Sequence, residues 1–368
     1  MRIALVTEYF YPHLGGVTEH VQNLAVQFRR QGHEVTIITS RIGGPRPEER
    51  SVHRLGRSVS LLSNGSFARV TVGWGLAAQL EDLFRKGRFD IVHVHGALAP
   101  TLGLLAPPAA HRLGIAVVAT FHSWFRRSLA YQVFRRPLQE RLDRIEAKIA
   151  VSQPVVDAMR RYLETDWHII PNGVNVDDFH PNGRRPMDAA IQHPRLLFLG
   201  RLDPRNGLDT VIDAMPRILA RYPQAELTVV GDGPLRGYYE HQTRGLKKSV
   251  RFVGQIYRER PAYYGESDLY LCPTDKASFG ITLLEAMACG TPMIVSDVPG
   301  FRELVDGGSE AVLVPPGNSA AWADTVVGLL EDPARRAVMG QAGLDKVTHY
   351  SWEVVAERVM GVYRTVHR

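Results

Sequence analysis

The sequence predicts an α/β protein made of two doubly wound domains in tandem. The chain has 368 residues, and at about 150 residues per domain this length suggests two domains. Short β-branched runs alternate with segments of helical period, which predicts parallel sheets with right-handed crossovers. The alternation begins again near Arg195. Two modules of the same kind therefore follow each other along the chain.

The first module is predicted from short apolar runs, each bounded by Gly, Pro or polar residues. The predicted strands are Arg2–Thr7, His33–Ser40, Ile91–Gly96, Ala116–His122 and Lys148–Ser152. A helix is predicted over Val17–Arg30, because apolar residues recur on one face and Gly32 follows. That face carries Val17, Val21, Leu24, Ala25 and Phe28.

The second module repeats this pattern. Its predicted strands are Arg195–Gly200, Glu226–Gly231, Arg251–Gln255, Leu269–Cys272, Met293–Ser296 and Ala311–Val314. Asn182–Pro194 is rich in Gly, Pro and polar residues and is the best linker candidate, and a final helix is predicted over Trp352–His367. Ligands of such sheets bind beyond the carboxyl ends of the strands, so two modules face to face would enclose one cleft.

The composition is that of an ordinary globular enzyme, with 45% hydrophobic and 22% charged residues. The N-terminal apolar run is too short for a signal peptide, and no stretch reaches the roughly 18 apolar residues of a membrane span. Cys272 and Cys289 lie in apolar stretches, so we expect inert core thiols and a cytoplasmic protein. The net charge of +6 and pI of 9.4 favour anionic partners. No zinc-ligand spacing or RNA-reading motif points to a metal or a nucleic acid.

Two motifs suit phosphate binding. Gly15 and Gly16 open the first predicted helix, where backbone N–H groups and the helix dipole attract anions, although a plain tight turn explains a glycine pair equally well. Arg201 and Arg205 follow the first strand of the second module. Their guanidinium groups suit a diphosphate, because Arg binds phosphate oxygens bidentately. The alternative is a pair of solvated surface arginines.

Two further residues stand out by position. His122 ends a strand at the predicted cleft lip, where a catalytic and a structural histidine are both reasonable. Glu285 lies within the apolar stretch Thr274–Gly290. A carboxylate in such surroundings needs a partner. The turn Gly231–Pro234 ends another strand and is either a cleft turn or a strand stop.

The ordered set of motifs resembles the family 4 glycosyltransferases, which are retaining enzymes of the GT-B fold with two Rossmann-like domains. Within that family the chain looks most like the phosphatidylinositol mannosyltransferases. The resemblance implies an acceptor domain over 1–172, a nucleotide-sugar domain over 173–351, and a last helix, 352–368, that packs back on the first. It covers nearly the whole chain. The motifs that carry it are Gly15–Val17, Ala119–His122, Val151–Ser152, Ile170–Val174, Gly200–Leu202, Val230–Gly233, Ser278–Gly280 and Leu284–Ala288.

The resemblance also implies roles for single residues. Glu285 would hydrogen-bond the ribose hydroxyls of the donor, and a carboxylate is a suitable acceptor for a vicinal diol. Catalytic roles fall on His122, which would orient the sugar, and on Arg201 and Arg205, which would stabilise the leaving diphosphate. Further donor contacts would come from Gly16, Gly233, Ile256, Ser278, Phe279, Gly280 and Ile281. Acceptor contacts would come from Tyr9, Asn64, Ser66 and Arg69.

The donor implied is a nucleotide sugar, GDP-mannose or a UDP-sugar, and the acceptor a phospholipid or a glycan. No cofactor and no metal are expected, since arginines take the place of a cation at the diphosphate. Three positions depart from the family pattern. Ala277 stands where the family carries a second Glu, Asn206 where it carries a phosphate-binding Lys, and Tyr257-Arg258 where an acidic residue would read guanine. A changed donor, a weakened activity, a non-catalytic binding protein, or another chemistry such as epimerisation or phosphorolysis stay open.

Contact with an anionic membrane surface is a further expectation. Leu76–Lys86 includes Glu81 and Asp82 and makes a poor anchor. Ser123–Arg136 is a better candidate, with aromatic residues between four arginines. The alternative is a mobile loop over the acceptor cleft. We therefore expect the protein in the cytoplasm, or at the cytosolic face of the membrane.

Overall fold

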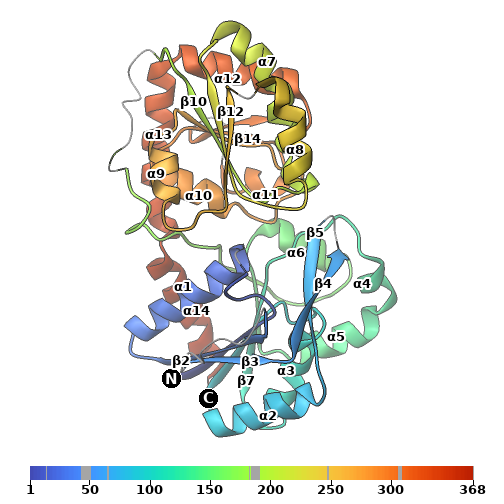
Figure 1. The fold of residues 1–368 in the computed structure, drawn as a ribbon. Coiled ribbons are helices and arrows are strands. Elements are labelled where there is room, and N and C mark those ends of the chain that lie inside the picture. The colour runs from blue at the N-terminus through green and yellow to red at the C-terminus, as the bar shows by residue number, and fades with distance from the viewer. Residues whose placement is uncertain are drawn as a thin grey trace. The chain divides into compact units, whose positions relative to one another are not determined.

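The computed structural model describes residues 1–13, 15–42, 51–63, 66–181, 183, 191–246, 248–305 and 309–367, except for the side chains of residues 61–63 and 66–68. The chain forms two compact units (Figure 1). The first comprises Met1–Gly173 and Trp352–Arg368, and the second is Val174–Ser351. The linker prediction at Asn182–Pro194 is wrong. The chain instead passes from the first unit to the second between Gly173 and Val174. Most of Asn182–Pro194 lies outside the described residues.

The first unit contains a seven-stranded, fully parallel sheet in the order β3-β2-β1-β6-β7-β8-β9. Ile3 on β1 pairs with Val35 on one side and Ile91 on the other, and all three are buried. The five predicted strands are confirmed within two residues at each end, whereas β3 and β9 were missed. The strands are β1 (Arg2–Thr7), β2 (Glu34–Ser40), β3 (Val52–Leu55), β6 (Ile91–His95), β7 (Ala116–Phe121), β8 (Ala147–Ala150) and β9 (His168–Ile169).

An antiparallel hairpin also belongs to this unit. Its strands are β4 (Arg57–Ser63) and β5 (Ser66–Val72), and Ser63 pairs with Ser66 next to the turn. The sequence singled out this segment for acceptor contacts without predicting a hairpin. Asn64, at its turn, lies outside the described residues, and so does the side chain of Ser66.

Helices α1 and α14 pack together in the core of the first unit. Trp352, Met360 and Tyr363 of α14 are buried with Leu24 and Phe28 of α1. The chain thus returns to its first unit after completing the second. The helices of this unit are α1 (Gly16–Arg30), α2 (Leu76–Gly87), α3 (Leu102–His111), α4 (Leu129–Val133), α5 (Arg135–Asp143), α6 (Gln153–Arg160) and α14 (Trp352–Val366).

The second unit contains a six-stranded parallel sheet in the order β12-β11-β10-β13-β14-β15. Here all six predicted strands are confirmed, because each contains a short apolar run, and the central strands β13 and β14 are buried along their whole length. The strands are β10 (Arg195–Leu199), β11 (Glu226–Val230), β12 (Val250–Gly254), β13 (Leu269–Cys272), β14 (Met293–Ser296) and β15 (Ala311–Val314).

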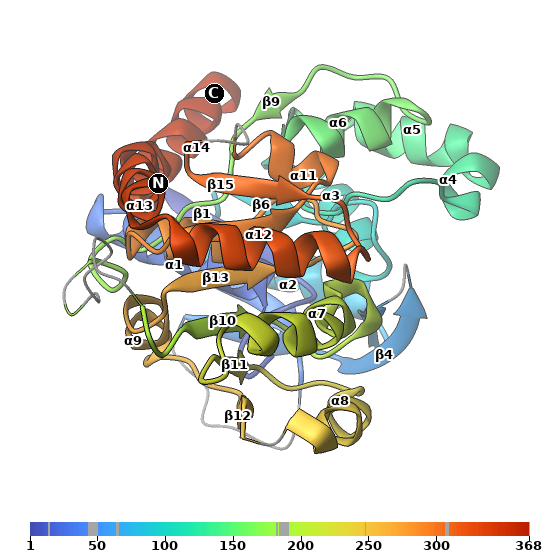
Figure 2. The same ribbon diagram turned by 90° about the horizontal axis from the view of Figure 1, so that it is seen from above.

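Helices α7 and α12 lie side by side over this sheet (Figures 1 and 2). Val211 and Met215 of α7 share one buried cluster with Trp322 and Val326 of α12. The helices of this unit are α7 (Leu208–Arg221), α8 (Arg236–Gln242), α9 (Arg260–Gly265), α10 (Ile281–Ala288), α11 (Pro299–Arg302), α12 (Ser319–Glu331) and α13 (Pro333–Val347).

Each sheet reverses its strand order at one place. In the first unit the reversal lies between β1 and β6, and in the second between β10 and β13. The crossovers leave these neighbouring strands in opposite directions, so their loops part at the carboxyl edge and ligands of such folds bind there. Both cysteines are free and buried, and burial raises the pKa of the Cys289 thiol to about 12, as expected for inert core residues. Among the described residues, none of the helices has the length and hydropathy needed to span a bilayer.

Candidate functional site

Glu8 organises the carboxyl edge of the first unit, directly after β1. Its side chain is buried, and its Oε1 accepts hydrogen bonds from the backbone N–H groups of Thr101 (2.9 Å) and Leu102 (2.6 Å) at the start of α3. Its Oε2 accepts from the Thr71 hydroxyl of β5. Burial raises the pKa of the Glu8 carboxyl, while these hydrogen bonds oppose the shift. One carboxyl group therefore ties the hairpin to the sheet and to α3.

Two of the predicted acceptor residues come together beside this carboxyl. The Tyr9 hydroxyl accepts from the backbone N–H of Arg69 at 3.1 Å. The Arg69 guanidinium donates to His13 Nδ1 (3.3 Å) and to Ser58 Oγ (3.3 Å). The hairpin thus places a partly buried cation next to the loop after β1. A guanidinium in such a place is suited to a phosphate or another anion.

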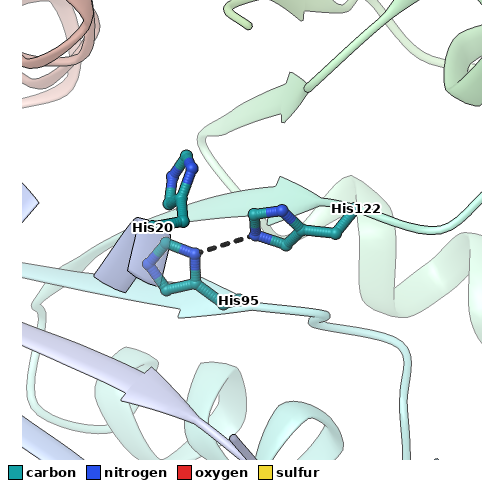
Figure 3. A group of neighbouring side chains, drawn as sticks. All are labelled: His20, His95 and His122. Carbon is teal, nitrogen blue, oxygen red and sulfur yellow. Dashed lines mark hydrogen bonds between the residues drawn. The ribbon is translucent and has the colours of Figure 1, made fainter. Parts of the chain in front are cut away.

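His122 follows β7 and belongs to a cluster with His20 and His95 (Figure 3). His95 is the last residue of β6, and its Nδ1 lies 3.1 Å from His122 Nε2. Burial lowers the pKa of His20 to about 4 and the pKa values of His95 and His122 well below their usual value. All three imidazoles are therefore uncharged at neutral pH. His122 can exchange hydrogen bonds with a ligand, but it does not bring a positive charge.

Gly16 begins α1, and His20 lies one turn further along the same helix. Gly15 precedes the helix with an extended backbone, and both glycines are exposed. Gly15 stands at the capping position and has no side chain with which to cap the helix. The backbone N–H groups of this first turn are a reasonable anion site at the reversal between β1 and β6.

In the second unit, Arg201 and Arg205 lie on the loop that leaves β10. The Asn206 side chain donates to the Arg201 carbonyl oxygen at 2.7 Å, which closes this loop. Asn206 therefore braces the backbone, where the family carries a cation. Arg205 Nε is buried and has no hydrogen-bond partner among the described residues. A buried donor of this kind is costly unless a ligand accepts from it.

Gly233 lies on the loop after β11, against the Arg201 loop. A Cβ at this position would come within 2.4 Å of the Leu202 carbonyl oxygen, so a side chain is excluded. The backbone N–H of Leu202 also donates to the Asp232 carbonyl oxygen at 3.0 Å. The close approach of these two loops explains the glycine by packing. A donor contact from Gly233 stays a prediction.

The segment Ser278–Gly280 follows β13, and Gly280 is the residue before α10. The predicted donor residues Phe279 and Ile281 flank this helix start, where Phe279 is 9% exposed and Ile281 partly exposed. Ile256 is partly exposed after β12. These segments follow β13 and β12, two strands of the same parallel sheet, so they share its carboxyl edge with Arg201.

Glu285 has protein partners that the sequence did not reveal. Its side chain is 1% exposed, its Oε1 accepts from Arg260 Nη1 at 2.7 Å, and its Oε2 accepts from the Tyr264 hydroxyl at 2.9 Å. Arg260 and Tyr264 lie four residues apart on α9, so both face the same way. The Arg260 guanidinium also lies over the rings of Phe179 and Tyr257, 5.3 and 5.5 Å from their centroids. The carboxylate is thus charge-paired, and its ribose role stays a prediction.

Comparison with known proteins decides the family. Residues 14–178 match the model of Glycosyltransferase Family 4, and residues 193–332 match Glycosyl transferases group 1. The phosphatidyl-myo-inositol mannosyltransferase of Mycobacterium leprae is 36% identical over 377 residues, which is 100% of this chain and 97% of the relative. The enzyme of that name from Mycobacterium tuberculosis is 37% identical over 384 residues, with 100% and 97% covered. The chain belongs to the family 4 glycosyltransferases.

Solved structures agree on the fold of this glycosyltransferase. Sucrose-phosphate synthase from Thermosynechococcus elongatus superposes with a TM-score of 0.77 at 24% identity, covering 99% of this chain and 98% of that one. Anabaena HepE in complex with UDP gives a TM-score of 0.79 at 19% identity, covering 99% and 100%. The glycosyltransferase therefore has the GT-B fold that the sequence predicts.

The Glu285–Arg260 pair gives the first testable prediction. We expect Glu285→Ala to lower the free energy of unfolding by about 3–5 kcal/mol, because it leaves the Arg260 charge buried without its partner. The double variant Glu285→Leu with Arg260→Met removes both charges and should lose much less. Urea denaturation of the three proteins measures this. A double variant as unstable as Glu285→Ala would show that the pair is not the cause.

Proposed function

We propose that this glycosyltransferase transfers a hexose, with mannose preferred, from a nucleoside diphosphate sugar to a hydroxyl of an inositol phospholipid headgroup, with retention at the anomeric carbon. The observation that carries the proposal is the similarity to the mycobacterial phosphatidyl-myo-inositol mannosyltransferases over the whole chain. The carboxyl edge of each sheet also supports it, because arginines at both edges are suited to binding phosphate groups. A UDP-sugar is the alternative donor, and a non-lipid glycan the alternative acceptor.

The donor diphosphate is assigned to the second unit. Arg201, Arg205 and the backbone N–H groups at the start of α10 stabilise the charge that grows on the leaving group, and such electrostatic stabilisation is often the largest catalytic contribution. The buried, unpartnered Nε of Arg205 supports this assignment. Arg205 precedes the position where the family carries Lys and supplies the charge that Asn206 lacks. No metal is needed for this step.

His122 orients the transferred sugar through hydrogen bonds. It is uncharged, because burial and the neighbouring histidines lower its pKa. A charged general acid is therefore absent from this position. The departing phosphate oxygen takes the proton of the acceptor hydroxyl, so the new glycosidic bond forms on the face from which the nucleoside diphosphate leaves.

The acceptor phosphate is assigned to Arg69, with Tyr9 beside it. The two hydrogen bonds of the Arg69 guanidinium, to His13 and Ser58, hold it in place. An anion bound there gains a charge-assisted contact with little ordering of the side chain. Asn64 and Ser66 are proposed as neighbours from the resemblance alone.

One observation favours a second candidate, a nucleotide-sugar-binding protein without transfer activity. Ala277 stands where the family carries a carboxylate, and its carbonyl oxygen lies close to Gly300, where an added Cβ would come within 2.3 Å. The backbone of residue 277 is tightly packed against Gly300, and its alanine side chain cannot supply the carboxylate that the family has at this position. Asp275 is the nearest acidic residue on the same loop, and burial raises the pKa of its carboxyl.

A substrate panel tests the proposed activity. We expect GDP-mannose to raise the melting temperature of the protein more than GDP or UDP-sugars do. When the protein is incubated with GDP-mannose and phosphatidylinositol, we expect mannose to be found on the lipid. Transfer from a UDP-sugar would replace the donor in the proposal. Binding without any product, on lipid or glycan acceptors, would favour the second candidate.

Two arginine variants separate the donor and acceptor assignments. Arg205→Ala removes a charge-assisted contact of about 1.5–3 kcal/mol, so we expect kcat/KM to fall roughly ten- to a hundredfold and the affinity for the nucleotide to fall with it. Arg69→Ala should raise the KM for the lipid while the nucleotide affinity is unchanged. The same defect in both variants would contradict the separate sites.

Each variant has a matched control. Arg217→Ala removes an exposed arginine of α7 that pairs with Asp324, and it should leave the kinetics unchanged. Ser58→Ala removes one hydrogen-bond partner of Arg69 but keeps its charge. We expect it to be far milder than Arg69→Ala, because the phosphate contact depends on the guanidinium.

We further propose that α4 and the start of α5 contact an anionic membrane surface. Leu129, Val133 and Phe134 are 75%, 64% and 57% exposed. A pocket of about 630 Å³ opens beside them, lined by Arg127, Gln132, Arg135, Arg161 and Tyr162. Exposed apolar residues next to arginines suit a lipid interface.

Part of the predicted membrane segment is wrong. Phe125 is buried, with its ring 5.1 Å from Tyr131 and 6.1 Å from Tyr162, so it stabilises the loop from inside. On α2, Arg85 and Lys86 pair with Glu81 and Asp82, which supports the expectation of a poor anchor there.

Vesicle binding tests this surface. We expect the protein to sediment with vesicles that contain phosphatidylinositol, and much less with pure phosphatidylcholine or at high salt. Leu129→Ser with Phe134→Ser should weaken the binding, whereas Val338→Ser, at a residue 64% exposed on α13, should not. If the Leu129→Ser, Phe134→Ser double variant bound these vesicles as well as Val338→Ser does, α4 would not be the membrane contact.

A further inference from the structure

We propose that His20, His95 and His122 form a binding site for one transition-metal ion, with Zn²⁺ the best fit. The three residues are far apart in the sequence, so no ligand spacing marks them. In the fold, one possible ligand atom from each lies within 4.8 Å of those of the other two (Figure 3). The expectation of a metal-free protein rests on the lack of a zinc-ligand spacing and on the arginines at the diphosphate, and the fold gives a reason to test it.

Three neighbouring elements bring the rings together. His95 ends β6 and pairs in register with Thr120, so the end of β7 holds His122 next to it. His20 comes from the second turn of α1. Its ring centroid lies 5.2 Å from that of His95 and 4.8 Å from that of His122. The site therefore belongs to one unit and to its ordered sheet edge.

The tautomer of His20 leaves a lone pair available for a cation. His20 Nδ1 lies 2.8 Å from Asn172 Oδ1, and a carbonyl oxygen only accepts, so Nδ1 carries the proton. Nε2 is then an acceptor, and it is buried with no hydrogen-bond partner among the described residues. An outer residue that orients a ligand through its second ring nitrogen is typical of histidine metal sites.

The other two rings complete a set of neutral ligands. His95 Nδ1 and His122 Nε2, which are 3.1 Å apart, share one proton between them, and a metal ion can replace this hydrogen bond once the proton moves to the other nitrogen of its ring. Two ligands about 2.0–2.1 Å from a tetrahedral zinc ion lie about 3.3 Å apart. Small ring rotations therefore suffice. Burial keeps all three pKa values low, so no positive charge opposes the cation.

The kind of ligand selects the kind of ion. Three imidazoles suit Zn²⁺, Co²⁺, Ni²⁺ or Cu²⁺, whereas Mg²⁺ and Ca²⁺ prefer oxygen ligands. His20 and His95 are buried, at 1% and 4% exposed, and His122 is partly exposed, which gives an ion a way in. Three protein ligands leave a fourth position for water or another small oxygen ligand, as in open zinc sites.

His93 is a near neighbour that does not belong to the site. Its Nδ1 lies 2.7 Å from the Tyr363 hydroxyl, and its Nε2 lies 2.7 Å from Thr120 Oγ1. Both of its nitrogens are engaged. The contrast with His20, whose Nε2 has no such partner, singles out the proposed ligands from the other buried histidines at this edge.

Metal binding by the folded, tag-free protein tests the proposal without any measure of transferase activity. After treatment with a chelator and desalting, the protein is titrated with Zn²⁺ against a chelating dye and with Co²⁺ by visible absorption. We expect one Zn²⁺ per chain, no competition from millimolar Mg²⁺, and the absorption of tetrahedral Co²⁺ with nitrogen ligands. Zinc that stays entirely on the dye, with no Co²⁺ spectrum, would overturn the proposal and leave the trio as a hydrogen-bonded cluster.

Variants then locate the ion. His20→Gln and His95→Gln should each weaken zinc binding by more than about tenfold, whereas the exposed His53→Gln should not. Asn172→Ala should weaken it by about 10- to 100-fold, and Asn172→Asp, which still accepts from Nδ1, should restore it. Circular dichroism confirms that each variant is folded. Full binding by folded His20→Gln and His95→Gln would place the ion elsewhere and refute the site.

Discussion

The reversal of strand order in each parallel sheet is the constraint on which both candidate edges depend. The chain winds from β1 towards β3 on one side and then resumes on the other side at β6, and the second unit repeats this at β10 and β13. Loops leave the two central strands in opposite directions, so the carboxyl edge opens between them. Glu8 and His95 lie at one such opening, and Arg201 and Ser278 at the other. The order of the strands therefore decides where the two candidate sites lie, and the individual side chains decide what each site can bind.

Burial is the second constraint, because each polar group at these edges needs a partner. Glu8 uses two backbone N–H groups at a helix start, and Glu285 uses a guanidinium and a phenol. The histidines instead remain uncharged. These are three different ways of limiting the desolvation cost of a titratable group. They also fix the side chains of Glu8 and Glu285 in place.

The extent to which sequence predicts this structure follows from the range of each signal. Strands such as Arg2–Thr7 and Met293–Ser296 were predictable because a continuous apolar run between turns is a local signal. His168–Ile169 was not, since two residues have no period, and the hairpin over residues 57–72 was hidden by its mixed polarity. The partners of Glu285 and the trio around His122 arise from contacts between distant segments. The i, i+4 spacing of Arg260 and Tyr264 indicates that they share a helix face. No local signal indicates that this face meets the carboxylate of Glu285.

The second unit is an insertion in the first, since Val174–Ser351 is continuous and the chain on both sides of it belongs to one unit. The backbone N–H of Val174 donates to the carbonyl oxygen of Tyr350 at 2.9 Å, and Val174 forms a parallel β-bridge with Ser351, so the entry and the exit of the insertion are neighbours. Because the two junctions of the insertion lie side by side in the fold, a different module could be inserted between them. The strand register of the host sheet would be untouched, and the exchange would alter what the molecule recognises without disturbing the fold that carries it.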